Sequence, residues 1–109
     1  MKKYPSDDQD YVRHDDQLEE SLRKSVFNDQ FKQDINYWKK TSPKKLARIR
    51  QLMEGIMQDP FKGKGHPKPL KYQGSDVWSR KIDEKHRIVY LVSVDQIDFL
   101  QARFHYDDM

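Results

Sequence analysis

The sequence predicts an α+β fold in which two N-terminal helices pack on an antiparallel β-meander. Between residues 28 and 58 the apolar residues recur with the period of a helix. After residue 76 they alternate in the segments VWSRKID, HRIVYLVSV and QIDFLQARFHY, which indicates β-strands. The turns between these segments are too short for a parallel crossover, so neighbouring strands should run antiparallel.

Caps and apolar stripes locate each predicted helix. Asn28 is a suitable N-cap for the first helix, and Ser42–Pro43 places a cap residue and a proline at the start of the second. Asp59–Pro60 ends the second helix, and a short strand is expected at Ser25–Phe27. The apolar faces that should pack on the sheet consist of Phe31, Ile35 and Trp38 in the first helix, and Leu46, Ile49, Leu52, Met53, Ile56 and Met57 in the second.

Charge divides the chain into two parts. Residues 1–25 contain five Lys/Arg against seven Asp/Glu, whereas residues 26–109 contain sixteen against eleven. We expect residues 1–25 to form a disordered or weakly helical acidic extension, and residues 26–109 to form the folded domain. The basic domain favours a polyanion as its partner. The extension either covers this basic face or takes no part in function.

Composition excludes several classes of protein. The chain has no cysteine, so it has neither a disulfide framework nor a thiolate metal site. It also lacks a clustered Asp/Glu/His pattern, and we expect no metal and no other cofactor. No apolar run approaches the length of a membrane span, so we expect a cytoplasmic protein without membrane association.

The loop GKGHPKPLKY, residues 63–72, contains three lysines, one histidine and no acid. Pro67 and Pro69 each remove a backbone donor and favour extended geometry in the preceding residue, which excludes a helix. The glycines and charges argue against a buried strand. We interpret the segment as a rigid, extended loop that grips phosphate.

Arginines interrupt the apolar alternation of the predicted strands at Arg80, Arg87 and Arg103. Buried arginine is costly unless it is paired. We therefore expect these cations to gather on a concave surface that the helices leave uncovered. The alternative is a set of ordinary cross-strand salt bridges with acids such as Asp83 and Glu84.

The C-terminal segment RFHYDD combines Arg103, His105 and Tyr106 at the end of a strand. Imidazole is well suited to proton transfer near neutral pH, and a phenol can orient a phosphate or stack on a base. With arginine to stabilise negative charge, these side chains suffice for metal-free RNA cleavage, because RNA carries its nucleophile in the 2′-hydroxyl.

The runs DPFKGKGHPKPLKY, VWSRKIDEKHRIVY and RFHY, together with the FxxDINYW helix, resemble the YoeB/Txe family of toxins from type II toxin–antitoxin systems. That family belongs to the RelE/ParE superfold, and the resemblance covers roughly residues 26–106. It implies an endoribonuclease that enters the ribosomal A site and cuts mRNA by 2′-hydroxyl attack without a metal. It also implies inhibition by a YefM/Phd-type antitoxin, and a possible homodimer.

The resemblance assigns roles to residues of this chain. Arg87 would stabilise charge on the scissile phosphate, His105 would be the general acid, and Tyr106 would position the phosphate or base. Together with the cations of the basic loop and strands, the expected RNA-binding residues are Lys64, His66, Lys71, Arg80, Lys81 and Arg103.

One position departs from the family pattern. The family usually has glutamate as the proposed general base where this chain has Lys68, and a lysine is protonated at neutral pH. Three interpretations are open. Lys68 acts electrostatically; or His66, two residues upstream in the extended loop and so on a similar side of it, is the base; or the chain is a weakened or inactive relative that only binds antitoxin or ribosome. A gyrase inhibitor of the ParE type shares the fold but would not need the Arg87, His105 and Tyr106 set.

Overall fold

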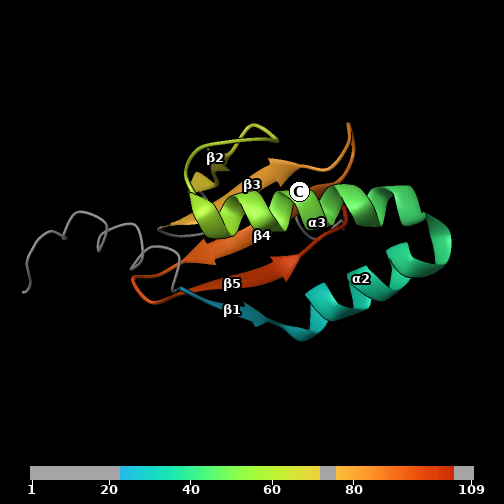
Figure 1. Ribbon diagram of the computed structural model, residues 1–109, viewed down its shortest axis with the longest axis horizontal. Coiled ribbons are helices and arrows are strands. Elements are labelled where there is room, and N and C mark those ends of the chain that lie inside the picture. The colour runs from blue at the N-terminus through green and yellow to red at the C-terminus, as the bar shows by residue number, and fades with distance from the viewer. Residues whose placement is uncertain (1–22, 72–75, 105–109) are drawn as a thin grey trace, which may run out of the picture.

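The computed structural model describes residues 23–71 and 76–104 (Figure 1). It confirms an α+β fold, with one five-stranded sheet of order β1-β5-β4-β3-β2 and two helices. Along the chain the elements are β1 (Lys24–Phe27), α2 (Asp29–Thr41), α3 (Pro43–Gln58), β2 (Lys68–Pro69), β3 (Val77–Lys81), β4 (Arg87–Val92) and β5 (Gln96–Gln101).

The centre of the sheet is the predicted antiparallel meander, in which β3 pairs with β4 and β4 with β5. Each edge has a strand from outside the meander (Figure 1). At one edge β1 runs parallel to β5, a pairing that the sequence analysis did not predict. At the other edge the short, exposed β2 pairs antiparallel with β3 and brings the basic loop to the sheet.

The folded unit begins a little earlier than residue 26. Lys24 and Ser25 already pair with β5, and Nε of Arg23 donates a hydrogen bond to the carbonyl of Ser93 at 3.1 Å. The remainder of the predicted acidic extension, residues 1–22, lies outside the described residues.

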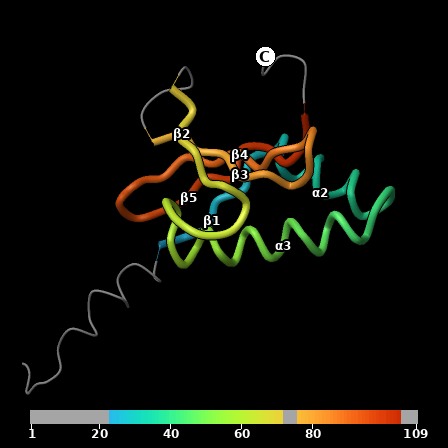
Figure 2. Tube along the Cα trace, turned by 90° about the horizontal axis from the view of Figure 1, so that it is seen from above, coloured from blue at the N-terminus to red at the C-terminus, as the bar shows by residue number. Residues whose placement is uncertain are grey.

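Both helices begin at the predicted caps. The Asn28 side chain accepts a hydrogen bond from the backbone N–H of Phe31, and the Ser42 hydroxyl accepts one from Lys45. Seen from above, α3 lies along one side of the sheet (Figure 2). No helix of the described segments covers the opposite side, which is therefore the exposed face of the sheet.

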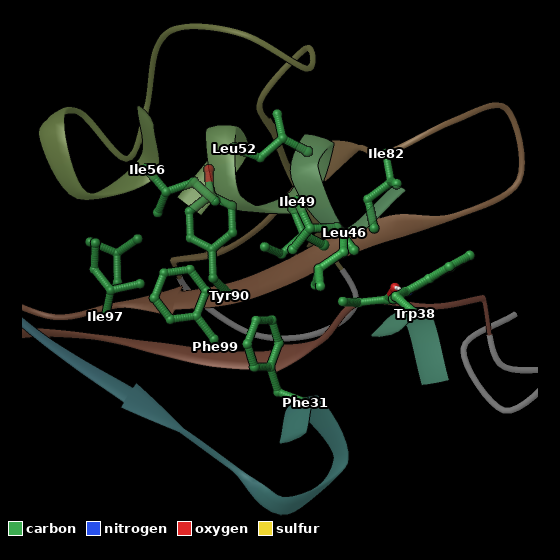
Figure 3. Close-up of a cluster of buried hydrophobic side chains, with 13 residues drawn as sticks. Phe31, Trp38, Leu46, Ile49, Leu52, Ile56, Ile82, Tyr90, Ile97 and Phe99 are labelled. Carbon is green, nitrogen blue, oxygen red and sulfur yellow. Dashed lines mark hydrogen bonds between the residues drawn. The ribbon is translucent and has the colours of Figure 1, made fainter. Parts of the chain in front are cut away.

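The core lies between the helices and the sheet (Figure 3). Ile49 and Ile56 of α3 are fully buried against Tyr90 of β4 and Phe99 of β5. Alternation along each strand sends such side chains to the helix-covered face and their neighbours to the exposed face. The predicted apolar stripes are thus confirmed, with Leu46 and Leu52 buried and Met53 and Met57 partly buried.

Residues 23–71 and 76–104 contain neither a membrane-spanning helix nor a metal-binding cluster. No helix in these segments is long and apolar enough to cross a membrane. No three His, Asp or Glu side chains there gather in an arrangement that would hold a metal ion.

Candidate nucleic-acid interface

A hollow of about 510 Å³ lies on the exposed face of the sheet. Its floor comes from the strand residues that alternate with the core, among them Ser79 and Val89. Four cations and one acid surround it, so its potential is positive. The lining residues are Lys68, Leu70, Ser79, Glu84, Lys85, Arg87, Val89, Leu100, Gln101, Arg103 and Phe104.

Arg87 is the first residue of β4 and is half-buried at one wall of the hollow. Its Nη1 donates to the carbonyls of Asp83 at 3.0 Å and His86 at 3.2 Å. These carbonyls belong to the tight β3–β4 turn, so the turn fixes where the guanidinium lies. The position fits the predicted role of Arg87 as a cation facing RNA.

The same turn is held together by Asp83. Its carboxylate accepts hydrogen bonds from Nζ of Lys45 at 2.5 Å and from the backbone N–H groups of Lys85 and His86 at 2.9 and 2.6 Å. Burial by itself would raise the pKa of Asp83, but these hydrogen bonds outweigh it and lower the pKa to about 2. Asp83 therefore stabilises the turn that positions Arg87.

This pKa predicts a loss of stability in acid. Because the folded-state pKa of Asp83 lies below its ordinary value of 3.8, its contribution is complete above that value and falls as pH drops toward 2. We expect a contribution of about 1–2 kcal/mol, reduced from the full shift because Lys45 is partly exposed. Urea unfolding measured between pH 6 and pH 2.5 should show that the native chain loses this part of its free energy of unfolding in acid, whereas Asp83→Asn does not. Equal pH dependence in the two proteins would contradict the assignment.

Arg103 reaches the hollow from the segment after β5. Its guanidinium stacks on the ring of Tyr37 in α2, with Cζ 3.6 Å from the ring centroid. Its Nε is buried without a hydrogen-bond partner among the described residues. A buried donor normally has an acceptor, but this nitrogen has no exposed surface, so what Arg103 offers a ligand in the hollow is the charge of its guanidinium.

Lys68 lies in β2 opposite Ser79, and its side chain lines the hollow as the loop interpretation requires. His66, two residues earlier, has φ 54°, so the extended backbone assumed for it is wrong. His66 does not line the hollow. The expectation that it lies on the same side of the loop as Lys68, and so could be the base, therefore loses its geometric support. Exposed Lys64 and Lys71 also lie outside the lining.

Lys81 forms a salt bridge with Glu84, as the alternative interpretation of the strand cations expected. Its Nζ lies 3.4 Å from Oε2 of Glu84, in an ion pair across the turn. Glu84 is almost fully exposed, and exposed pairs of this kind contribute little to stability. Lys81 is thus available to a ligand only at the rim of the hollow.

The expectation that Arg80 contacts RNA is wrong. Arg80 is fully buried on the helix-covered face, because alternation in β3 turns it away from the hollow. Its guanidinium donates to the carbonyls of Asp59 at 2.6 Å, Lys62 at 3.0 Å and Lys64 at 3.1 Å. The pairing that a buried arginine requires is supplied by backbone carbonyls instead of by RNA.

Tyr90 extends this cluster. Its hydroxyl accepts a hydrogen bond from Nε of Arg80 at 3.1 Å and donates one to the carbonyl of Pro60 at 2.6 Å. Burial raises the pKa of Tyr90, so the hydroxyl keeps the proton that it donates. Arg80 and Tyr90 together fold the segment 59–65 around one buried charge.

The two loop glycines fit around the Arg80 side chain. Gly63 and Gly65 have φ values of 128° and 86°, which favour glycine. A Cβ on Gly63 would lie 3.0 Å from Nη1 of Arg80, and one on Gly65 would lie 2.8 Å from Cδ2 of Leu52. The GKG sequence is therefore required for close packing, and it delivers Lys68 to the sheet edge.

The predicted acid His105 and the predicted phosphate-positioning Tyr106 lie outside the described residues. They follow Phe104, which lines the hollow. The sequence analysis missed Lys85, whose Nζ lies 5.5 Å from the ring centre of Phe104 at the same wall. Its place in the short connection just before Arg87 was the available signal.

A mixed sheet with helices on one face and a cation-lined hollow on the other defines a small α+β protein with a candidate site for an anionic ligand. Residues 27–106 match the family described as YoeB-like toxin of bacterial type II toxin–antitoxin system. The chain belongs to this family, which confirms the resemblance found in its motifs.

Individual relatives agree with this assignment. Toxin YoeB of Streptomyces coelicolor is 46% identical over 74 residues, covering 68% of this chain and 88% of that protein. The YoeB/ParE toxin from Agrobacterium tumefaciens superposes with a TM-score of 0.70 at 34% identity, covering 76% of this chain and 99% of that one.

A third relative has been solved in two assemblies. The YoeB dimer from Staphylococcus aureus has a TM-score of 0.71 at 28% identity, covering 78% of this chain and 99% of that one. The heterotetrameric YoeB–YefM toxin–antitoxin complex from the same organism has a TM-score of 0.69 at 28% identity, covering 77% and 98%.

Proposed function

We propose that this chain is an endoribonuclease that cleaves mRNA in the ribosomal A site, by attack of the RNA 2′-hydroxyl and without a metal ion. The observation that supports this most directly is the convergence of Lys68, Arg87 and Arg103 on one hollow of the exposed face. Cations so placed can stabilise the phosphorane-like transition state of 2′-hydroxyl attack. The cytoplasm is the expected location of a protein with a ribosomal substrate.

Charge stabilisation and protonation of the leaving group each have a candidate. Arg87 stabilises charge on the scissile phosphate, and the guanidinium of Arg103 adds a second positive charge at the hollow. His105 protonates the leaving 5′-oxygen while Tyr106 positions the phosphate or base. Because the 2′-oxygen replaces the 5′-oxygen on phosphorus, the products are a 2′,3′-cyclic phosphate and a free 5′-hydroxyl.

Other predicted RNA contacts lie outside the hollow. Lys64, His66 and Lys71 are exposed and can meet the RNA backbone beyond the reaction centre. Lys81 can do so at the rim once its exposed partner Glu84 moves aside. Arg80 is omitted from this set because of its burial.

The base remains the open step. Glu84 is the one carboxylate among the described residues that line the hollow, and it is almost fully exposed and paired with Lys81. We therefore assign Lys68 an electrostatic role, in which its ammonium stabilises the 2′-alkoxide as the 2′-hydroxyl proton passes to solvent water. The alternative is a weakened toxin that still binds antitoxin or ribosome.

Cleavage of ribosome-bound mRNA by the native chain, Lys68→Glu and Lys68→Ala distinguishes these alternatives. If Lys68 acts electrostatically, the native chain should cut as fast as Lys68→Glu, and Lys68→Ala should be slower by about 10²-fold. Faster cutting by Lys68→Glu would show a weakened toxin. Full activity of Lys68→Ala would remove the electrostatic role. Lys44→Ala, on the exposed surface of α3, is the matched control.

We also propose that a YefM/Phd-type antitoxin binds this chain and that the free toxin forms a homodimer. The support is that the Staphylococcus aureus relative was solved both with YefM and as a dimer. Since the ribosomal A site and the antitoxin would compete for one small basic domain, antitoxin binding would inhibit the toxin.

A further inference from the structure

Two of the three residues after β5, Ala102 and Phe104, are attached to α2 and to the β3–β4 turn by hydrogen bonds with side chains. The carboxylate of Asp34 accepts the backbone N–H of Ala102 at 2.8 Å, and Nε1 of Trp38 donates to the carbonyl of Ala102 at 2.8 Å. Nδ1 of His86 accepts the backbone N–H of Phe104 at 2.9 Å. We call Asp34, Trp38 and His86 the C-terminal clamp.

The clamp replaces the sheet at the point where regular pairing stops. β5 ends at Gln101, so the ladder hydrogen bonds with β4 do not extend to Ala102 and Phe104. Buried backbone groups require partners, and the clamp side chains provide them. Asp34 is almost completely buried at 1% exposure, a costly place for a carboxylate that makes no such bond.

His86 can accept this hydrogen bond only in one chemical form. A backbone N–H donates to Nδ1, so the imidazole must be neutral with its proton on Nε2. The edge-to-face contact with the Trp38 ring, 4.9 Å between centroids, fixes the plane of the imidazole. Protonation would put a second donor opposite the Phe104 N–H and break the bond.

The surroundings favour the neutral form. Burial lowers the pKa of His86, and the positive charges of Lys85, Arg103 and Lys45 lower it further, while Asp83 opposes them. The hydrogen bond from Phe104 to His86 is therefore intact at neutral pH and is lost when His86 takes up a proton below the ordinary histidine pKa of 6.5, while the bonds of Asp34 and Trp38 to Ala102 remain.

We propose that His86, supported by Asp34 and Trp38, is a positioning residue that sets the direction in which the chain continues from Phe104 into His105 and Tyr106. The inference rests on the proposed function, because His105 and Tyr106 are its acid and its phosphate-positioning group. One covalent bond separates Phe104 from His105, so a rotation of the Phe104 backbone displaces the imidazole that must meet the leaving oxygen.

The test compares His86→Asn with His86→Leu. The side-chain oxygen of asparagine can occupy the place of Nδ1 and accept the Phe104 N–H, whereas leucine fills the space without an acceptor. We expect His86→Leu to lower kcat for ribosome-bound mRNA by about 10²-fold with little change in KM, and His86→Asn to restore most of it. Ile97→Val, a core change away from the clamp, controls for loss of stability alone.

An NMR readout makes the inference independent of activity. In the native chain the amide resonance of Phe104 should shift as His86 titrates below pH 6.5, and His86→Leu should abolish that titration and accelerate amide hydrogen exchange at residues 104–106. His86→Asn should abolish the titration but keep the slow exchange.

The outcomes separate the two proposals. If the native chain does not cleave mRNA, the proposed function fails, and the exchange rates at 104–106 still decide whether His86 orders this segment. If the native chain cleaves and His86→Leu has the same kcat, or if exchange at 104–106 is unchanged in His86→Leu, the positioning role is refuted.

Discussion

Arg87→Ala should lower the rate of mRNA cleavage by about 10²–10³-fold, because it removes a preorganised cation aimed at the developing phosphate charge. The turn carbonyls of Asp83 and His86 already hold the guanidinium at the wall of the hollow, so no reorganisation is needed when RNA binds. A single-turnover assay on programmed ribosomes with excess toxin measures the chemical step directly.

Two comparisons make this result specific to charge placement. Arg87→Lys keeps a cation but loses the fork that the turn carbonyls fix, so it should recover only part of the rate. Lys44→Ala removes a cation from the exposed surface of α3 and should leave the rate unchanged. Cleavage by Arg87→Ala at the native rate, with an unaltered thermal midpoint, would exclude Arg87 from the reaction.

Arg80→Leu should lower the free energy of unfolding by about 3–5 kcal/mol, a large part of the stability of a small domain. The substitution leaves the buried carbonyls of Asp59, Lys62 and Lys64 without their shared donor. Urea unfolding followed by circular dichroism gives the value. If this variant does not fold at all, its loss of unfolding free energy exceeds about 3–5 kcal/mol, and Arg80 is still shown to stabilise the fold.

Graded variants test the cause of that loss. Tyr90→Phe removes only the hydroxyl between Arg80 and Pro60 and should cost about 1–3 kcal/mol. Lys81→Ala, at the next position of β3, should change stability by under about 1 kcal/mol because its ion pair is exposed. An Arg80→Leu protein as stable as Lys81→Ala would refute the structural role.

Local signals were sufficient for most of the fold. Asn28 and Ser42–Pro43 start helices because their caps act within one turn of backbone. The meander follows from strand period and turn length, which are also local. The parallel pairing of Lys24–Phe27 with β5 was missed because its partners lie about 70 residues apart, and no local pattern specifies such a pairing.

The candidate site was predicted in part. Arg87 and Arg103 were expected on a surface free of helices and Lys68 in the phosphate-gripping loop, and all three line the hollow. Arg80 was misassigned because an arginine within an apolar strand looks the same in sequence whether carbonyls or RNA neutralise it. The extended backbone expected at His66 was wrong because its left-handed conformation is not visible in the residue type.

By itself, the sequence determined the helices, the meander, the basic character of the domain and its membership of the YoeB-like toxins, since these depend on period, composition and motif spacing. Only the tertiary structure decided which cations are free for a ligand. Arg80 and Arg87 lie seven positions apart in adjoining strands, and the face to which each side chain points depends on the register of the sheet and on what covers it. Burial of a charge is a property of three-dimensional packing, and no single stretch of residues specifies it.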